Sequence, residues 1–148
     1  GICQKVHYEG QAAIELEEIA DRRFKGPCYG FELKKGTGLP YIISTGKMWP
    51  ELLEDISRGI KVEILAAKFH WTLAHIITHT CLALEGLLPS RKVALSGGVM
   101  QNKLLTEILV PMLEEKGFEP LLHRQVPAND GGLSLGQAVI GGRVGRCV

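Results

Sequence analysis

The chain has 148 residues, of which 45% are hydrophobic and 22% charged, a composition typical of a globular protein rather than of a disordered segment. Its formal net charge of +1, with no basic cluster, excludes nucleic-acid binding by bulk electrostatics, so a bound anion would have to be recognised locally. No apolar run reaches the ~18 residues of a membrane span, and the cysteines (Cys3, Cys28, Cys81 and Cys147) form no C-x-x-C pair, so we expect a reducing, cytoplasmic setting.

The first predicted element is an amphipathic helix within residues 8–22 (YEGQAAIELEEIADR), preceded by a turn at Gly10. Apolar residues recur there at helical spacing, with acidic residues on the opposite face. The predicted apolar face comprises Ala13, Ile14, Leu16, Ile19 and Ala20. Residues 29–33 (YGFEL) and 41–45 (YIIST) then flank the turn-rich stretch KKGTGLP, a pattern that favours a β-hairpin insertion.

Two further helices are predicted next. One starts at Pro50, because proline is favoured in the first turn of a helix, and Gly59 interrupts it. A long helical pattern follows from Lys61 to Leu84, and its apolar content predicts a helix that forms part of the core.

The rest of the chain alternates strands and helices. Residues 91–96 (RKVALS) and 119–124 (EPLLHR) predict strands, the first of them buried. Residues 101–117 and 131–142 predict the helices that follow them. Short connections between strand, helix, strand and helix are typical of a parallel α/β unit. We therefore expect an α/β fold that forms a single domain over residues 1–148.

The stretch Ser96-Gly97-Gly98 lies where the first of these strands ends and a helix is expected to begin directly. Such a junction points backbone N–H groups and the positive end of the helix dipole at one spot, which attracts phosphate. Glycine suits the position because a Cβ would block a phosphate oxygen and because the turn is expected to need positive φ. The alternative is a tight turn capped by Ser96, without a ligand. No Gly-Lys-Ser/Thr and no G-x-G-x-x-G follows, which excludes a Walker loop and disfavours a dinucleotide-binding fold.

A second polar junction, PANDGGLSLGQA at residues 127–138, follows the next strand. Asn129 and Asp130 precede a diglycine and a helix, so we expect them at the same sheet edge as Ser96-Gly97-Gly98. Asp130 is a candidate ligand for a cation that neutralises phosphate charge, and its alternative role is N-cap of the last helix. Two such junctions at one edge predict a nucleotide-phosphate site.

Three histidines lie on the predicted long helix. His75 and His79 are spaced i, i+4, which can place two imidazoles on one metal ion, but their apolar neighbours favour histidines at the helix surface or at an interface. His70 follows Phe69 at the start of an apolar stripe, where it either reaches an interface between lobes or is a satisfied core histidine. No spacing suggests a hydrolytic triad, which argues against covalent catalysis.

Four stretches together resemble the C-terminal part of the HypF family of hydrogenase-maturation carbamoyltransferases, across nearly the whole chain. They are YEGQAAIELE (8–17), FH (69–70), ALSGGVMQN (94–102) and HRQVPANDGGLSLGQA (123–138). The SGGV-x-x-N element alone is similar to a wider group that includes the threonylcarbamoyl transferases of tRNA modification. The resemblance implies the second lobe of an actin-like ATPase (ribonuclease H-like) fold, in which a parallel or mixed sheet is flanked by helices.

For chemistry, the resemblance implies ATP-dependent carbamoyl transfer. Carbamoyl phosphate would be converted through carbamate to an enzyme-bound carbamoyl adenylate. The carbamoyl group would then pass to the C-terminal cysteine thiolate of the partner HypE and become a cyanide ligand of a nickel-iron centre. Neither a nucleic acid nor a membrane is among the partners implied.

The matched positions carry the family's roles as expectations. The candidate nucleotide-binding residues are Ser96, Gly97, Gly98, Asn102, Gly10, Gln11 and Glu15. The glycines at 97 and 98 would contact phosphate, Asn102 and the Gly10-Gln11 turn the nucleoside, and Glu15 the ribose. Asp130 would ligate a divalent metal ion, whether magnesium, iron or zinc. The family's remaining metal ligands, a histidine pair and an aspartate, have no match here, and HIITH lies in the wrong place to supply them.

Two other hypotheses stay open. The family's upstream domains are not matched and the chain begins at Gly1, so we expect a fragment that is incomplete as an enzyme. Such a fragment would be an interaction module if the helix around His70 to His79 docks the missing lobe or the acceptor protein. A tRNA threonylcarbamoyl transferase relative is the other alternative, disfavoured by GQAAIELE and VPANDGG. The sequence assigns no role to Cys147.

Overall fold

The computed structural model describes residues 5–36 and 41–144, so Cys3 and Cys147 lie outside the described residues. The helices are α1 (Gln11–Ile19), α2 (Met48–Ser57), α3 (Val62–Leu84), α4 (Lys103–Glu115) and α5 (Leu133–Val144). The strands are β1 (Glu32–Lys34), β2 (Ile42–Ser44), β3 (Lys92–Leu95) and β4 (Glu119–Leu122). Short 3₁₀ turns are η1 (Glu85–Leu87), η2 (Gly98–Gln101) and η3 (Asp130–Gly132). The predicted order of helices and strands is confirmed.

The strands form two small sheets. β1 and β2 pair antiparallel with Leu33 opposite Ile43, which confirms the predicted hairpin. β3 and β4 pair parallel with Ala94 opposite Leu121. Because parallel strands need a crossover connection, α4 runs back between them, and the predicted strand-helix-strand unit is confirmed.

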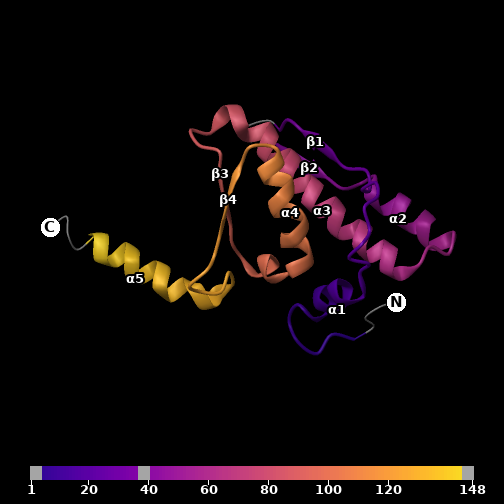
Figure 1. Ribbon diagram of the computed structural model, residues 1–148, viewed down its shortest axis with the longest axis horizontal. Coiled ribbons are helices and arrows are strands. Elements are labelled where there is room, and N and C mark those ends of the chain that lie inside the picture. Colours follow the sequence, from indigo (N-terminus) through magenta and orange to yellow (C-terminus); the bar gives the residue numbers. More distant parts are fainter. Residues whose placement is uncertain (1–4, 37–40, 145–148) are drawn as a thin grey trace.

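The helix α3 is the centre of the packing, with α4 alongside it and α1 and α2 against its other parts (Figure 1). The main core cluster joins α3, β3, α4 and the start of β4, and its buried members are Ala74, Leu95, Leu105, Leu109, Leu113 and Phe118. A smaller cluster joins α1, α3 and α4, and its buried members are Ala20, Ala66, Ala67 and Leu104. The prediction that the long helix forms the core is therefore confirmed. In its stretch from His70 to His79, alternate residues are buried against the neighbouring elements and the others are partly exposed, so a docking role for this stretch stays a prediction.

One prediction of burial is wrong, and one predicted apolar face is buried only in part. The strand β3 is not buried as a whole: Leu95 is buried, whereas Lys92 and Ala94 are exposed, because the strand packs on the core through one face. In α1, Ala13 and Ile14 are exposed, and the helix meets the core further along, through Ile19 and the adjoining Ala20. Alternation along a strand and the exact contact stripe of a helix depend on which neighbours cover them.

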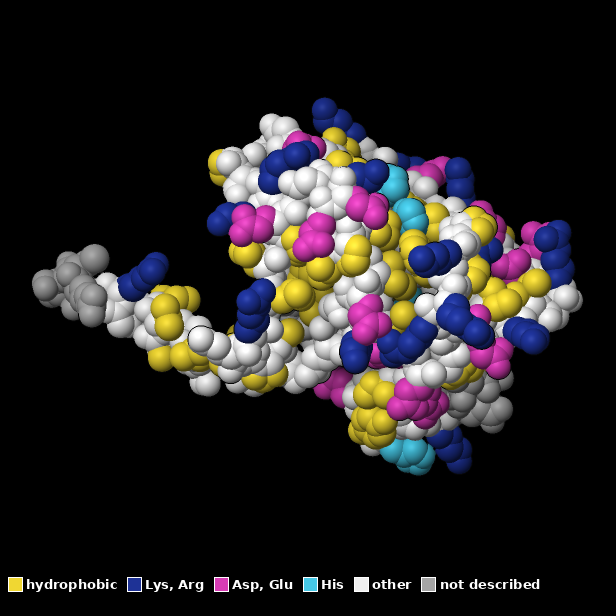
Figure 2. All heavy atoms as spheres, in the orientation of Figure 1, with side chains coloured by type: hydrophobic (Ala, Val, Ile, Leu, Met, Phe, Trp, Pro, Cys, Tyr) yellow, Lys and Arg dark blue, Asp and Glu magenta, His cyan; other side chains and the backbone are white. Residues whose placement is uncertain are grey.

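The helix α5 projects away from the rest of the molecule (Figure 1). Its apolar side chains lie on the surface of this arm, beside a hollow that separates it from the body (Figure 2). The most exposed are Leu133 at 59%, Leu135 at 47%, Val139 at 53% and Ile140 at 66%. Among the described residues, no helix combines the length and the apolar character needed to cross a membrane.

Candidate functional site

The two polar junctions predicted from the sequence meet in the structure. The amide of Gly97, at the end of β3, donates a 2.8 Å hydrogen bond to the carbonyl of Ala128, in the loop after β4. Asn129 and Asp130 follow directly, so they lie beside the Ser96-Gly97-Gly98 turn. This confirms the expectation that both junctions occupy one edge of the sheet, where parallel α/β folds bind ligands.

A cleft of about 590 Å³ opens at this edge, and we call it the acidic cleft. Its lining residues are Glu9, Gly10, Ala13, Gly98, Val99, Gln101, Asn129 and Asp130. Two of them carry a carboxylate, and the described lining residues include no lysine or arginine. These carboxylates disfavour a bare polyanion in the cleft, and a cation bound with it would offset the repulsion.

A second cleft of about 550 Å³ is continuous with the first, and the residues that line both are Glu9, Gly10, Ala13, Gly98, Val99 and Gln101. We call it the apolar cleft, because side chains from α1, α3 and α4 give it a largely hydrocarbon wall. These side chains are Ile14, Leu16, Phe69, Leu73 and Leu105. His70 and Asn102 also line it, from α3 and from the residue before α4. The volume and the lining suit a flat apolar group with a few polar atoms.

The two glycines of the Ser96-Gly97-Gly98 turn differ in what the structure requires of them. Gly97 has φ +99° and ψ 162°, a region that is essentially restricted to glycine, so the turn itself requires it. Gly98 does not have positive φ, and a Cβ built on it would meet nothing within 4 Å. The fold therefore leaves room at Gly98 that a close ligand would use. Gly10, the N-cap of α1, has φ +81° and lines both clefts.

The expectation that a helix begins directly after Gly98 is wrong. The 3₁₀ turn η2 intervenes, and α4 begins only after Asn102, whose Oδ1 accepts a 2.7 Å hydrogen bond from the amide of Leu105. The carboxylate of Glu17 on α1 accepts a 3.0 Å bond from the amide of Leu104. Protein side chains thus already use two first-turn amides of α4. The amides of Gly98 and Val99 donate to no described residue. The turn, and not the N-terminus of α4, therefore offers N–H groups from which an anion could accept hydrogen bonds.

Ser96 and Asp130 do not have the capping roles considered as alternatives. The hydroxyl of Ser96 lies 2.9 Å from Nε2 of His123, and Asn102 caps α4 instead. At the second junction the N-cap is Asn129, whose Oδ1 accepts a 3.1 Å bond from the amide of Gly131. Asp130 is exposed, forms no ion pair with a described residue, and lines the acidic cleft. Its carboxylate is available to a ligand.

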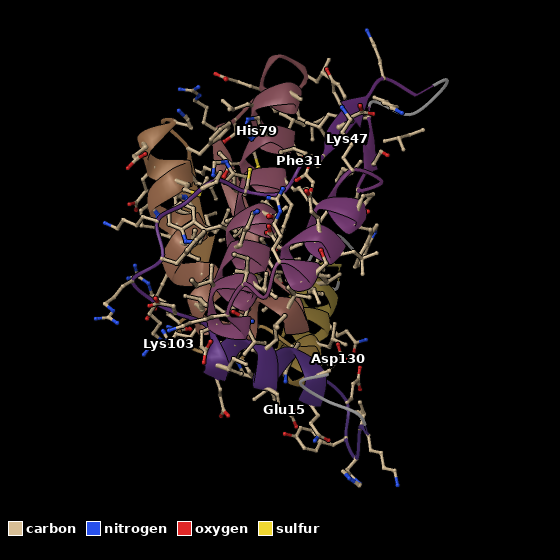
Figure 3. The ribbon with its side chains drawn as sticks, turned by 90° about the vertical axis from the view of Figure 1, so that its right-hand side faces the viewer. Glu15, Phe31, Lys47, His79, Lys103 and Asp130 are labelled. Carbon is tan, nitrogen blue, oxygen red and sulfur yellow. The ribbon has the colours of Figure 1, made fainter. Side chains whose placement is uncertain are left out.

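Two expected nucleoside contacts lie outside the clefts. Oε1 of Gln11 accepts a 2.7 Å bond from the amide of His7, and its Nε2 donates a 2.6 Å bond to Glu15. Both side chains are on α1, and neither lines the acidic or the apolar cleft. In Figure 3, Glu15 and Asp130 are at the same end of the molecule. The structure therefore gathers Gly10, Gly98, Asn102 and Asp130 around the two clefts and leaves this pair at the periphery.

The histidine pair of the long helix lies far from these clefts. Nδ1 of His79 donates a 2.8 Å bond to the carbonyl of His75, and the ring of Phe31 meets His79 edge-on at 5.4 Å. Both Phe31 and His79 are at the end of the molecule opposite Glu15 and Asp130 (Figure 3). Within residues 5–36 and 41–144, no group of three His, Cys, Asp or Glu residues is arranged to hold a metal ion. His79 is exposed at the helix surface, whereas His75 is half-buried.

Sequence reasoning missed three features of the site. Glu9 and Gln101 line the acidic cleft, and each is a direct neighbour in sequence of a predicted contact, Gly10 or Asn102. Their position next to predicted contact residues was the signal in the sequence that could have identified them. The third feature is the contact of His70 with Asn102, which no local pattern indicates, because the two residues are far apart in sequence.

The chain matches known carbamoyltransferases throughout. A family model described as "Carbamoyltransferase, Kae1-like Domain, second subdomain" matches residues 1–137. A carbamoyltransferase HypF of Rhizobium leguminosarum bv. viciae is 38% identical over 133 residues, covering 88% of this chain and 16% of that protein. A carbamoyltransferase HypF of Synechocystis sp. is 32% identical over 139 residues, covering 93% of this chain and 17% of that protein.

Solved structures agree with these matches. A full-length HypF, crystallised in a phosphate- and nucleotide-bound form, superposes with a TM-score of 0.88 at 35% identity, over 97% of this chain and 19% of that one. T. kodakarensis HypF superposes with a TM-score of 0.79 at 28% identity, over 97% of this chain and 18% of that one. The chain thus spans less than a fifth of the length of each relative and solved structure compared.

Proposed function

The chain belongs to the carbamoyltransferase HypF family, as its Kae1-like second subdomain, and on that premise we propose that it is the nucleotide-binding lobe of an ATP-dependent carbamoyltransferase. Its α/β fold is consistent with the lobe of an actin-like ATPase. The observation that carries the proposal is the convergence of Gly10, Gly98 and Asp130 on the acidic cleft. The cytoplasmic location expected from the sequence belongs to the same proposal.

The phosphates of the nucleotide are assigned to the acidic cleft. The amides of Gly98 and Val99 donate to no described residue, so they are available to phosphate oxygens. The space beside Gly98 lets an oxygen approach the backbone, which a larger residue would prevent. Gly97 holds the turn in place through its bond to Ala128.

A divalent cation is part of the proposal because of the charge of the cleft. Glu9 and Asp130 would repel a polyphosphate, and the described lining residues offer no positive side chain to offset them. Asp130 supplies an exposed carboxylate, the oxygen donor that magnesium and other hard cations prefer. When bound, the cation neutralises phosphate charge and polarises the phosphate oxygens. Further ligands would come from the phosphates and from residues outside this chain.

The nucleoside is assigned to the apolar cleft. Phe69, Leu73 and Leu105 offer apolar surface to a purine, and Asn102 lies at the same wall as a polar contact. Gly10 lines both clefts, so the ribose, which joins the base to the phosphates, would lie near it.

The proposed reaction is transfer of a carbamoyl group. Carbamate formed from carbamoyl phosphate attacks the α-phosphorus of ATP and releases pyrophosphate, and the product is carbamoyl adenylate. The thiolate of the C-terminal cysteine of HypE then attacks the carbamoyl carbon, and AMP leaves. Both steps need positioning and charge stabilisation rather than a protein nucleophile. The roles assigned to residues of the two clefts are accordingly binding roles.

Titration calorimetry of ATP with Mg²⁺ tests the proposal, on the natural polypeptide that carries this chain. Asp130→Asn should weaken ATP binding by tenfold or more, whereas Glu114→Gln, an exposed carboxylate on α4, should leave it unchanged. Carbamoyl transfer to a HypE acceptor should fall in parallel in Asp130→Asn. Equal ATP affinity and equal transfer in the two variants would show that Asp130 is not the metal ligand. Acceptance of threonylcarbamoyl instead of carbamoyl groups would favour the tRNA-modification alternative.

A role as a docking module is the second candidate, and α5 is the observation that favours it. This helix exposes apolar side chains to solvent along its length, and such surface is normally covered. The occupant that fits is the preceding part of a HypF polypeptide, because more than four fifths of each matched relative lies outside the matched segment. The two candidates are compatible, since a lobe that docks upstream domains can also hold the nucleotide.

A further inference from the structure

His70 is a buried polar residue at the wall of the apolar cleft. It is 2% exposed and lies on the central helix α3, one of the few polar side chains that the described core contains. A buried imidazole must have its polar atoms paired, or it destabilises the fold. The hydrogen-bond partners of the two ring nitrogens therefore indicate the role of His70.

The hydrogen bonds of His70 set its tautomer. Nδ1 lies 2.8 Å from the carbonyl of Ala66, and a carbonyl can only accept, so Nδ1 carries the proton. Nε2 is then an acceptor, and it receives a 2.9 Å bond from Nδ2 of Asn102. The ring thus presents a lone pair to the residue that begins α4.

Hydrogen bonds also fix the orientation of the side-chain amide of Asn102. Its Oδ1 accepts from the amide of Leu105 at 2.7 Å, and its Nδ2 donates to His70, so both ends of the group are held and a flip would break both bonds. An amide has two N–H donors and two acceptor lone pairs. One N–H and one lone pair of Asn102 are therefore left for a ligand in the apolar cleft, in a fixed direction.

We propose that His70 is a positioning residue that orients the Asn102 amide toward the nucleoside in the apolar cleft. The inference rests on the proposed function, because the ligand that it orients toward is the nucleoside. His70 and Asn102 line the apolar cleft and not the acidic cleft, whereas Asp130 lines the acidic cleft and not the apolar one, so His70 acts on the nucleoside end of the ligand. Its loss should therefore affect ligands according to whether they carry a nucleoside.

The experiment compares two ligands, ATP and inorganic triphosphate, each with Mg²⁺, by titration calorimetry on the natural polypeptide that carries this chain. His70→Leu removes the acceptor while keeping an apolar side chain of similar bulk. His70→Gln restores an acceptor oxygen at a similar reach. The matched control is Thr78→Val, a buried polar residue on the same helix whose hydroxyl has no described hydrogen-bond partner.

His70→Leu should weaken ATP binding by tenfold or more and leave triphosphate binding within twofold. His70→Gln should bring ATP binding back to within about threefold, and Thr78→Val should change neither ligand. Asn102→Ser keeps a capping oxygen for the amide of Leu105 but lacks the side-chain amide that donates to His70, so it should show the same selective loss. Adding His70→Leu to it should cause no further loss, because both changes remove one interaction.

In His70→Leu, either equal weakening of ATP and triphosphate binding, which indicates a general structural role, or unchanged ATP binding would overturn the inference alone. An additive effect in the double variant would overturn it as well. Failure of the unsubstituted protein to bind ATP would be a different result, since it overturns the proposed function and the inference with it. Thermal unfolding of each variant shows whether a loss of binding reflects a loss of fold.

Discussion

The amide of Gly97 donates a 2.8 Å hydrogen bond to the carbonyl of Ala128, and this bond joins the end of β3 to the loop that carries Asp130. The two residues are 31 positions apart in sequence (128 minus 97) and belong to different junctions of the parallel unit. The glycine turn and the carboxylate therefore face one cleft because of a backbone contact, which any change in the Gly97 conformation would disturb.

Substitutions of the two glycines should have opposite consequences. Gly98→Ala should leave thermal unfolding unchanged or slightly raise its midpoint, because the added Cβ meets nothing within 4 Å and alanine has less conformational freedom in the unfolded chain. ATP binding should nevertheless fall by tenfold or more. Gly97→Ala should lower the free energy of unfolding by about 1–3 kcal/mol, because its φ of +99° strains any other residue.

Circular dichroism melting and ATP titration of the two variants check this pair. Unchanged ATP binding in a folded Gly98→Ala protein would mean that the glycine is only part of a turn. An unfolding midpoint of Gly97→Ala equal to that of the unsubstituted protein would contradict the strain argument.

The contact between α2 and α3 should make stability depend on acidic pH. Nζ of Lys68 lies 2.8 Å from Asp55, and this ion pair is largely shielded, with side-chain exposures of 16% and 19%. The hydrogen bond from Lys68 lowers the pKa of Asp55 below its usual value of 3.8, against the effect of burial. Because the carboxylate is favoured in the folded state, its contribution is present above pH 3.8 and is lost as the pH falls through the lower, folded pKa.

Asp55→Asn should therefore cost about 1–2 kcal/mol at neutral pH and much less in strong acid. Urea unfolding across the acid range measures this. The exposed pair of Glu54 with Arg58 is the matched control, and Glu54→Gln should have little effect at any pH. An Asp55→Asn cost that stays constant down to pH 2, or that is no larger than the control, would contradict the role of the pair.

His75 should titrate below the usual range of histidine. Burial lowers its pKa from 6.5, and the nearby positive charges of His79 and Lys116 lower it further. The unfolded chain then binds the proton more readily, so the stabilising contribution is present above pH 6.5 and is lost as the pH falls through the folded pKa. His75→Gln should reduce the loss of stability in this window. NMR titration of the ring should give a midpoint under 6.5, and a midpoint above it would contradict the assigned environment.

The exposed arm should make the 148-residue chain associate with itself. Leu135 and Ile140 are 47% and 66% exposed, so a double substitution to serine removes apolar surface without opening the core. Sedimentation velocity should show a concentration-dependent oligomer that the double variant reduces, at an unchanged unfolding midpoint. A monomer at high concentration, or a double variant that unfolds earlier, would show that α5 is not a free apolar surface.

Much of the fold follows from local patterns. Two short β-type runs that flank the turn-rich KKGTGLP stretch predicted the hairpin of β1 and β2, and two strand-helix pairs predicted the parallel pairing of β3 with β4. The position of the glycine turn beside Asp130 followed from the rule that parallel strands end at one edge. These features depend on hydrophobic periodicity and turn preferences, which are set by residues close together in the sequence.

The details of the site depend on contacts between residues that are distant in the sequence. Whether a helix begins at Gly98 or after Asn102 depended on which side chain caps it, and the cap is held by His70 from another helix. Gln11, although next to Gly10, bonds to Glu15 and not into a cleft. Contacts of this kind join residues that packing alone brings together.

By itself, then, the sequence determined the order of elements, the parallel unit, the sheet edge at which the two polar junctions meet and the family to which the chain belongs. Only the tertiary structure decided that Gly97 serves the turn while Gly98 leaves space, that Asn102 is held by His70, and that α5 is left exposed. The physical reason is that hydrophobic period and turn preference act over a few residues, whereas side-chain pairing and burial depend on which distant segments the fold brings into contact.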